Sequence, residues 1–328
     1  MNHPDTQPFD ELTPDTVLDL VDQCGFRTDG RLLALNSYEN RVYQVGVEDA
    51  SPVIAKIYRP GRWADECIIE EHQYTAHLAD LDIPVVPPLV CQDSTLHRAG
   101  PYRFAIYPRQ GGREPELESD EHLAWMGRLL GRIHAVGRQQ AFSHRISLTP
   151  KTYGLDQSEF LLAGDWIPDF LTAKFEALYG QLLEAIENRY ALAGRVAPIR
   201  VHGDCHRGNV LWTDAGPHCV DFDDTCMAPA IQDLWMMLDG NADRQRHQLD
   251  VLLEGYEQFV PFDPAELHLI EALRTLRMIN YAAWLARRWS DPAFPRSFPW
   301  FGQPRYWEEH FEALTEQLSA LHEPTIQL

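Results

Sequence analysis

The sequence has little of three things: basic charge, long apolar runs and paired cysteines. Lys and Arg number 28 against 49 Asp and Glu, a net charge of −21. A nucleic-acid-binding surface needs clustered basic residues, so nucleic acid is not an expected partner. No stretch approaches the ~20 apolar residues of a membrane span. The six cysteines include no CxxC pair, which favours a reducing cytoplasm over a disulfide-stabilised extracellular setting.

The amino terminus adds no targeting signal to this picture. Its first residues, MNHPDTQPFDELTPD, are polar and acidic, without the basic and apolar regions of a signal peptide. Apolar residues make up 45% of the chain and charged residues 23%, as in ordinary globular proteins. We therefore expect a cytoplasmic globular protein that binds neither nucleic acid nor a membrane.

Local patterns predict an α+β protein in two parts. Thr13 and Pro14 open a helix as N-cap and first helical residue, and further elements are predicted at 41–47 and 52–58 (a β-hairpin), 65–81 (a helix) and 102–107 (a strand). The breakers Pro108, Gly111 and Gly112 end this β-rich region. The remainder is mostly helical, so we predict a small part at 1–108 and a larger helical part at 109–328.

A polar, loop-rich island at 199–224 interrupts the helical part. Two short strands at 210–212 and 218–220 are joined by Gly216-Pro217. Antiparallel pairing would bring Asn209, before the first strand, beside Asp221, after the second. A carboxylate and an amide oxygen held together favour a hard cation such as Mg²⁺.

Asp204 precedes Asn209 by five residues, the spacing that a kinase catalytic loop uses between its base and a metal ligand. In that chemistry Asp204 accepts the proton of an attacking hydroxyl, while the metal ligands hold a phosphate. A Zn²⁺ hydrolase is the rival interpretation: His202, Asp204 and His206 alternate, and Cys205 and Cys219 are further possible ligands.

Lys56 distinguishes these two interpretations. It stands in VIAKIY (residues 53–58), a pattern in which a strand lysine reaches nucleotide phosphates, and a Zn²⁺ hydrolase leaves it unexplained. Its ion-pair partner is expected from the following helix, with Glu71 as first choice and Glu70 in reserve, because only one of two neighbours points inward.

The expected nucleotide site lacks one usual feature, because no GxGxxG precedes Lys56. The run LNSYENRVY (residues 35–43) stands in its place. Taken alone, it predicts an ordinary polar turn; in a nucleotide site Ser37, Asn40 and backbone N–H groups would bind phosphates. Tyr107, at the junction of the two parts, would lie beside the adenine as a hinge. Arg274 and Arg277 share a predicted helix and form either a solvated face or an anion contact.

Several of these strings together resemble one family. HGDCHRGN (202–209), VDFDD (220–224) and IQDL (231–234) are similar to the motifs of the aminoglycoside phosphotransferase and choline kinase group, within the protein-kinase-like superfamily. With LNSYENRVYQV, KIYRP, EEHQ and YAAWLARRW they resemble a bacterial stress-response branch of that group. The likeness runs from about Leu12 to the carboxyl terminus.

The resemblance implies a two-lobed, protein-kinase-like fold and an ATP- and Mg²⁺-dependent kinase acting on Ser or Thr of proteins. Carried over by position, Asp204 is the base, and Asn209 and Asp221 are the Mg²⁺ ligands. Lys56 and Ser37 bind nucleotide, and Asp233 supports the catalytic loop, in which His202 packs. Since an A-P-E activation segment is absent, a small-alcohol kinase (aminoglycoside, choline or homoserine) stays open, as does a nucleotide-binding regulator without catalysis.

Overall fold

The computed structural model describes residues 8–327, so part of the amino-terminal segment discussed above lies outside it. The chain divides into two compact units, each built from more than one segment. Unit 1 comprises Met1–Glu116, Ser143–Arg145 and Arg207–Thr225; unit 2 comprises Leu117–Phe142, Ile146–His206 and Cys226–Leu328. This differs from a single cut after residue 108, because two later segments pack with the amino-terminal one.

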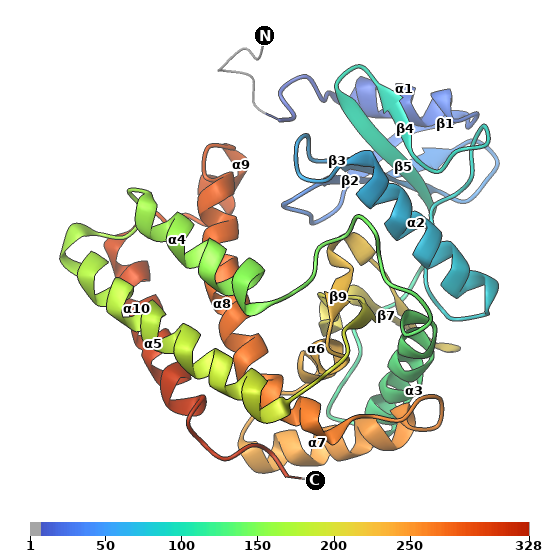
Figure 1. Ribbon diagram of the computed structural model, residues 1–328. Helices are drawn as coiled ribbons and strands as arrows, with labels where there is room; N and C mark the ends of the chain where they lie inside the picture. Colours follow the sequence, from blue (N-terminus) through green and yellow to red (C-terminus); the bar gives the residue numbers. More distant parts are fainter. Residues whose placement is uncertain (1–7, 328) are drawn as a thin grey trace. The chain divides into compact units, whose positions relative to one another are not determined.

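Unit 1 is built on a five-stranded antiparallel sheet with strand order β1-β2-β3-β5-β4 (Figure 1, blue to cyan). Its elements are α1 (Pro14–Gln23), β1 (Thr28–Ala34), β2 (Arg41–Val47), β3 (Val53–Tyr58), α2 (Asp65–Asp80), β4 (His97–Ala99) and β5 (Tyr102–Pro108).

The two faces of this sheet are covered by different helices. On one face, α1 packs against alternate residues of the strands, among them Ala55 and Ile57. The residues between them turn to the other face, where Tyr58 packs with Ile68 of α2. Because side chains alternate along a strand, Lys56 lies on the α2 face, with Ala105 of β5 as its cross-strand neighbour.

A second hairpin belongs to unit 1 although it comes a hundred residues later. Strands β7 (Val210–Thr213) and β8 (Gly216–Cys219) pair with each other, and 3₁₀ turns flank them at Arg207–Asn209 and Phe222–Asp224. Isolated bridges tie β8 to Val85 and β7 to Arg113. These contacts place the hairpin in unit 1.

Unit 2 is mainly helical. Its elements are α3 (Asp120–Gly137), a π-helix (Pro150–Leu155), α4 (Asp156–Ala163), α5 (Asp169–Ala193), β6 (Ile199–Val201), β9 (Cys226–Ala228), α6 (Ile231–Trp235), α7 (Ala242–Tyr256), a 3₁₀ helix (Pro264–Leu269), α8 (Ile270–Arg288), α9 (Ala293–Ser297) and α10 (Pro304–Ala320).

Glycines let α3 and α7 approach backbone to backbone. A Cβ at Gly127 would lie 2.0 Å from the Leu252 carbonyl oxygen, and one at Gly255 would lie 2.3 Å from that of Ala124. No side chain fits such gaps without displacing a helix. The close packing fixes the register of α3, which carries His134, against α7, which ends at Tyr256.

Most of the expected elements of unit 1 are confirmed. Thr13 caps α1 by accepting a hydrogen bond from the Thr16 N–H, and the first hairpin, α2 and β5 lie within a residue or so of the predicted bounds. The edge strands β1 and β4 were not predicted from the sequence. The architecture is α+β, as predicted.

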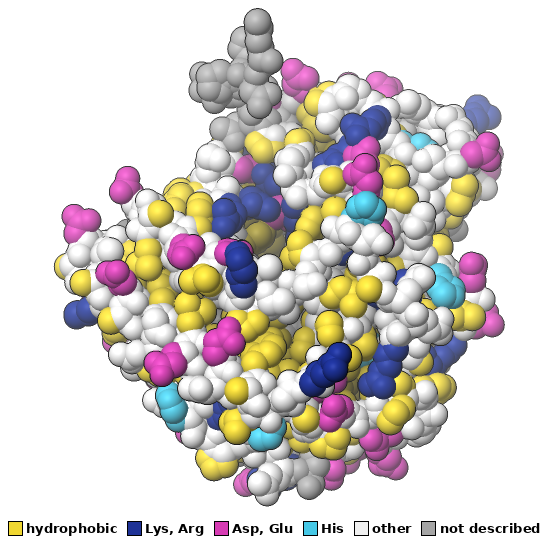
Figure 2. Space-filling view, viewed as in Figure 1, with side chains coloured by type: hydrophobic (Ala, Val, Ile, Leu, Met, Phe, Trp, Pro, Cys, Tyr) yellow, Lys and Arg dark blue, Asp and Glu magenta, His cyan; other side chains and the backbone are white. Residues whose placement is uncertain are grey.

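On the face seen in Figure 2, acidic charge is distributed rather than concentrated. Figure 2 shows Asp and Glu side chains scattered over the face in view, without one dominant acidic patch. Within residues 8–327, no helix combines the length and apolar character that crossing a bilayer requires.

Candidate active site

The centre of unit 1 is a buried lysine surrounded by carboxylates. Lys56 Nζ lies 2.9 Å from Asp221, 3.2 Å from Asp223 and 3.9 Å from Glu71. Its side chain is only 8% exposed. Burial alone would lower the pKa of Lys56, but Asp221, Asp223 and Glu71 raise it well above its ordinary value. The amine is therefore held as a cation in the interior, paired with carboxylates.

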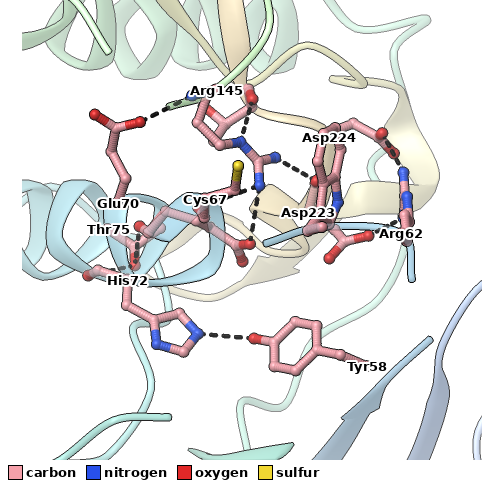
Figure 3. Close-up of polar contacts among 12 residues, drawn as sticks. Tyr58, Arg62, Cys67, Glu70, His72, Thr75, Arg145, Asp223 and Asp224 are labelled. Carbon is pink, nitrogen blue, oxygen red and sulfur yellow. Dashed lines mark hydrogen bonds and ion pairs between the residues drawn. The ribbon is translucent and has the colours of Figure 1, made fainter. Parts of the chain in front are cut away.

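The two neighbouring glutamates of α2 have separate tasks. Glu71 is buried and faces Lys56, as the first choice of the sequence analysis required. Burial raises the pKa of Glu71 to about 7, against the opposing effect of the Lys56 ammonium. Glu70 points elsewhere and accepts hydrogen bonds from the backbone N–H groups of residues 143–145, at 2.5–3.0 Å (Figure 3).

Asp223 is a component that the sequence analysis did not assign. It is buried, pairs with Lys56 and forms an ion pair with Arg62, which also contacts Asp224 at 2.5 Å. Burial alone would raise the pKa of Asp223, but Arg62, Lys56 and Arg145 lower it strongly. The sequence shows the adjacent carboxylates of VDFDD, but it does not show which of them points into the interior.

Arg145 completes this network from the short segment 143–145. Its guanidinium donates to the carbonyl of Thr225 at 2.8 Å and to that of Asp223, and it lies 3.8 Å from Glu71. Figure 3 shows it between α2 and the turn after β8. Arg145 thus links the α2 carboxylate to the backbone that carries the Asp221–Asp223 turn.

The second hairpin brings Asn209 and Asp221 together as predicted from the strand pattern. Val210 pairs with Cys219, and the Val220 N–H donates to the Asn209 carbonyl at 3.0 Å. Asp221 follows with a left-handed backbone, φ 59°, and its side chain is 55% exposed. A carboxylate and an amide oxygen are donor types that suit a hard divalent cation, so the residue types at 209 and 221 fit Mg²⁺.

Ser37 and Asn40 lie in the turn between β1 and β2. The Ser37 hydroxyl donates to the Asn40 carbonyl at 3.1 Å. Asn40 is buried, and its side-chain oxygen accepts the Arg59 N–H at 3.1 Å. The Asn40 side chain therefore anchors the turn to the end of β3, while Ser37 shapes it. Their contact with nucleotide stays a prediction.

Tyr107 lies inside β5, opposite Ile54 of β3. Its hydroxyl lies 3.0 Å from that of Tyr58, which in turn bonds His72 at 2.7 Å. The side chain is thus part of a hydrogen-bonded network on the α2 face. The predicted role of Tyr107 beside the adenine is untested.

Unit 2 carries the loop with Asp204, and Asp233 supports that loop. The buried carboxylate of Asp233 accepts the N–H groups of His202 at 2.8 Å and Gly203 at 2.9 Å. Its third partner is His134 Nε2 at 2.9 Å, whose other nitrogen lies 3.1 Å from the Tyr256 hydroxyl. Burial alone would raise the pKa of Asp233, but His134 and the backbone donors lower it.

Asp204 itself is held by a cation. Arg277 of α8 lies 2.6 Å from one carboxylate oxygen, and His206 lies 3.6 Å from the other. Burial alone would raise the pKa of Asp204, but Arg277 and His206 bring it below its ordinary value. Of the two options for Arg277, the structure selects the anion contact.

The Zn²⁺ alternative receives no geometric support. In the part of the chain that the structure describes, one group of three His, Cys, Asp or Glu residues has ligand atoms within 4.8 Å of one another, and it consists of Cys24, Cys91 and His97. His202, His206 and the cysteines of the island are not in it. His202 is instead buried, and its ring accepts the Asp204 N–H at 3.3 Å.

Comparison with known proteins finds related sequences over nearly the whole chain. The model of the phosphotransferase enzyme family (APH) matches residues 31–270. Stress response kinase A of Escherichia coli K12 is 42% identical over 98% of this chain and 97% of its own length. The serine/threonine protein kinase RdoA of Salmonella typhimurium LT2 has the same identity and coverage.

Solved structures share the fold at low identity. An amicoumacin kinase, hAmiN, in complex with AMP-PNP and Ca²⁺, aligns with a TM-score of 0.69 at 19% identity, covering 90% of this chain and 92% of that one. Spectinomycin phosphotransferase APH(9)-Ia with ADP and spectinomycin aligns with a TM-score of 0.64 at 15% identity, covering 97% and 99%. The protein-kinase-like fold expected from the sequence is thereby confirmed.

Proposed function

Because the chain belongs to the phosphotransferase enzyme family, we propose that it is a cytoplasmic kinase. It transfers the γ-phosphoryl group of ATP, with Mg²⁺, to Ser or Thr hydroxyls of proteins. The observation that carries the proposal is the buried Lys56 cation, paired with Glu71 of α2 and with Asp221 at the end of β8.

Unit 1 supplies the nucleotide half of this chemistry. Lys56 would bind phosphate oxygens, and Glu71 would keep its ammonium in place. Asn209 and Asp221 would hold Mg²⁺, which would supply positive charge to neutralise the phosphates. Arg62 keeps Asp223 ionised and therefore keeps a second carboxylate near the lysine.

Unit 2 supplies the base. Asp204 accepts the proton of the acceptor hydroxyl as the oxygen attacks phosphorus. The lowered pKa of Asp204 keeps the carboxylate ionised at neutral pH. Asp233 fixes the backbone of the loop through two N–H groups, so the carboxylate is oriented before substrate arrives.

The choice of a protein acceptor is supported by the relatives. One relative that is 42% identical over nearly the whole chain is named a serine/threonine protein kinase. The solved neighbours whose names give small-molecule acceptors, such as an aminopropanol kinase, share only 13–19%. A small-alcohol kinase of the aminoglycoside, choline or homoserine type is the alternative. A regulator without catalysis is disfavoured, because Lys56, Asp204, Asn209 and Asp221 are all retained.

The test is γ-labelled ATP with Mg²⁺ and three acceptors: the protein itself, a generic protein substrate and a panel of small alcohols. The Asp204→Asn variant runs in parallel. Label on protein that the variant fails to transfer supports the proposal. Label confined to a small alcohol replaces it with the alternative. ATP binding without any transfer, in the presence of all acceptors, favours the regulator.

A further inference from the structure

Three segments of unit 1 bring two thiols and an imidazole together, away from the Lys56 cluster. Cys24 ends α1, Cys91 precedes a tight turn, and His97 begins β4. Both sulfur atoms and one imidazole nitrogen lie within 4.8 Å of one another. The cysteines are 9% and 8% exposed. Residues so far apart in sequence meet here because the fold brings them together.

The positions of these groups are fixed by the backbone around them. Cys91 and Ser94 exchange two backbone hydrogen bonds at 2.8 and 3.0 Å, which closes the turn between them. The side chain of Gln92, within that turn, donates to the Gln23 carbonyl at the end of α1 at 2.8 Å. The turn is thereby held to α1, and Cys91 is held close to Cys24.

His97 contributes the observation that points to a ligand. Its Nε2 is buried and has no hydrogen-bond partner. Its ring packs at a tilt against Phe104 on the neighbouring strand, with centroids 5.4 Å and ring planes 38° apart. A buried polar atom without a partner is rare in folded proteins and calls for an explanation, and a metal bond provides one.

We propose that Cys24, Cys91 and His97 form a binding site for a thiophilic metal ion, of which Zn²⁺ is the representative. Two thiolates and one imidazole suit Zn²⁺ or Cu(I), whereas Mg²⁺ and Ca²⁺ prefer oxygen ligands. The site is therefore chemically distinct from the Asn209 and Asp221 pair. Three protein ligands leave a fourth position of a Zn²⁺ tetrahedron for water.

Metal binding would release protons from the two thiols. Two thiols and one Zn²⁺ give a dithiolate complex and two protons, while the neutral imidazole of His97 donates its lone pair. The ion would join the end of α1 to the turn at 91–94 and to the edge strand β4. Since it binds the folded arrangement, it stabilises unit 1; the site lies outside the catalytic machinery, so the inference stands apart from the proposed function.

The experiment uses the full-length, reduced protein stripped with a chelator and titrated with Zn²⁺ and with Co²⁺. We expect about one equivalent to bind with a saturable rise in melting temperature, and Co²⁺ to produce a thiolate-to-metal charge-transfer band. Cys24→Ser, Cys91→Ser and His97→Gln should each lose the band or weaken binding at least tenfold. Cys67→Ser is the matched control, because Cys67 is 9% exposed, like Cys24.

A second measurement needs no variant and so is independent of folding defects. Alkylation of the wild-type protein, followed by mass spectrometry, should show Cys24 and Cys91 protected by Zn²⁺ while Cys67 and Cys226 react at unchanged rates. Absence of saturable binding overturns the proposal. So does metal binding that leaves the alkylation rates of Cys24 and Cys91 unchanged. So does a Cys24–Cys91 disulfide in protein purified without reductant, if the reduced form then binds no metal.

Discussion

Arg277 and Asp204 form an ion pair with one nitrogen and one carboxylate oxygen 2.6 Å apart, 73 residues apart in the chain. Arg277 is 41% exposed and Asp204 24%. The arginine is thus accessible, but its contact is with the residue assigned as the base. If Asp204 is the base, as proposed, its carboxylate has a cationic partner before the acceptor arrives, and that partner lowers its pKa.

Replacing Arg277 by Met should move the acidic limb of the activity profile. Arg277 lowers the pKa of Asp204, and a general base works only when ionised. Activity therefore falls as the pH drops through that pKa, and without Arg277 the fall begins at a higher pH. The measurement is kcat/KM against pH for both proteins.

The control is Arg274→Met, one turn away on α8. Arg274 contacts Glu271 and Gln245 rather than Asp204. We expect its pH profile to match the wild type. An unshifted acidic limb in Arg277→Met would show that the ion pair does not set the protonation of the base.

Asp204→Ala should lower kcat by about 10²–10⁴, the usual contribution of a general base. Nucleotide binding should be nearly unchanged, because Lys56, Asn209 and Asp221 belong to the other unit. Isothermal titration with a non-hydrolysable ATP analogue measures the binding, and label transfer measures kcat. If affinity collapsed together with turnover, Asp204 would be a nucleotide ligand instead of the base.

Asp221→Ala should remove the Mg²⁺ dependence of nucleotide binding, since it takes away the charged ligand of the proposed ion. The analogue is titrated at several Mg²⁺ concentrations. Asp214→Ala is the matched control, because Asp214 is an exposed aspartate on the same hairpin. A variant that retained the wild-type Mg²⁺ response would exclude Asp221 as a ligand.

Lys56→Met should weaken ATP binding and destabilise the fold by roughly 3–5 kcal/mol, as removal of one partner from a buried ion pair does. The deficit should shrink at lower pH. Without the ammonium, the pKa of Glu71, already raised to about 7, rises further. Its folded value, already above its unfolded one, then lies further above it, so the stability that protonation of Glu71 contributes is present below the unfolded pKa and lost as pH rises through the folded pKa.

Thermal denaturation across the pH range checks this expectation. Lys174→Met, on the exposed side of α5, serves as the control and should leave stability and its pH dependence unchanged. If Lys56→Met were equally destabilised at all pH values, the remaining carboxylates would not be relieving the loss of the lysine by taking up protons.

Gly127→Ala should cost about 1–3 kcal/mol of stability, the typical result of overpacking, because the added Cβ would lie 2.0 Å from the Leu252 carbonyl oxygen. Gly180→Ala in α5 is the opposite case. No heavy atom lies within 4 Å of its Cβ, so the helix should gain about 0.5–1 kcal/mol. Urea unfolding of both variants provides the comparison, and a stable Gly127→Ala would show that α3 and α7 can separate.

The features that sequence patterns predicted here are local. Strand alternation placed Lys56 on one face of the sheet, and helical periodicity allowed only one of Glu70 and Glu71 to reach it. The hairpin pattern brought Asn209 to Asp221. Each rule concerns residues within one element or one turn, where geometry is set by the backbone repeat.

The features that escaped prediction depend on long-range packing. Asp221 has a left-handed backbone, and both Asp221 and Asp223 contact Lys56; no periodicity encodes this turn. Arg277 reaches Asp204 only because α8 packs beside the loop within unit 2. Arg145 donates to backbone carbonyl groups, which every residue type has, so the sequence does not indicate these partners. Partners of this kind cannot be predicted from sequence patterns, and only the tertiary structure shows them.

The 165 residues that separate Lys56 from Asp221 have a consequence during synthesis on the ribosome. At about 5–20 residues per second, the strand carrying Lys56 emerges roughly 8–33 seconds before the turn that carries Asp221 and Asp223. During this interval the nascent amino-terminal sheet contains a lysine that lacks two of its three counter-ions. Unit 1 can therefore reach its final form only after much of unit 2 has been translated, and premature termination before residue 221 leaves a sheet with an unbalanced interior charge.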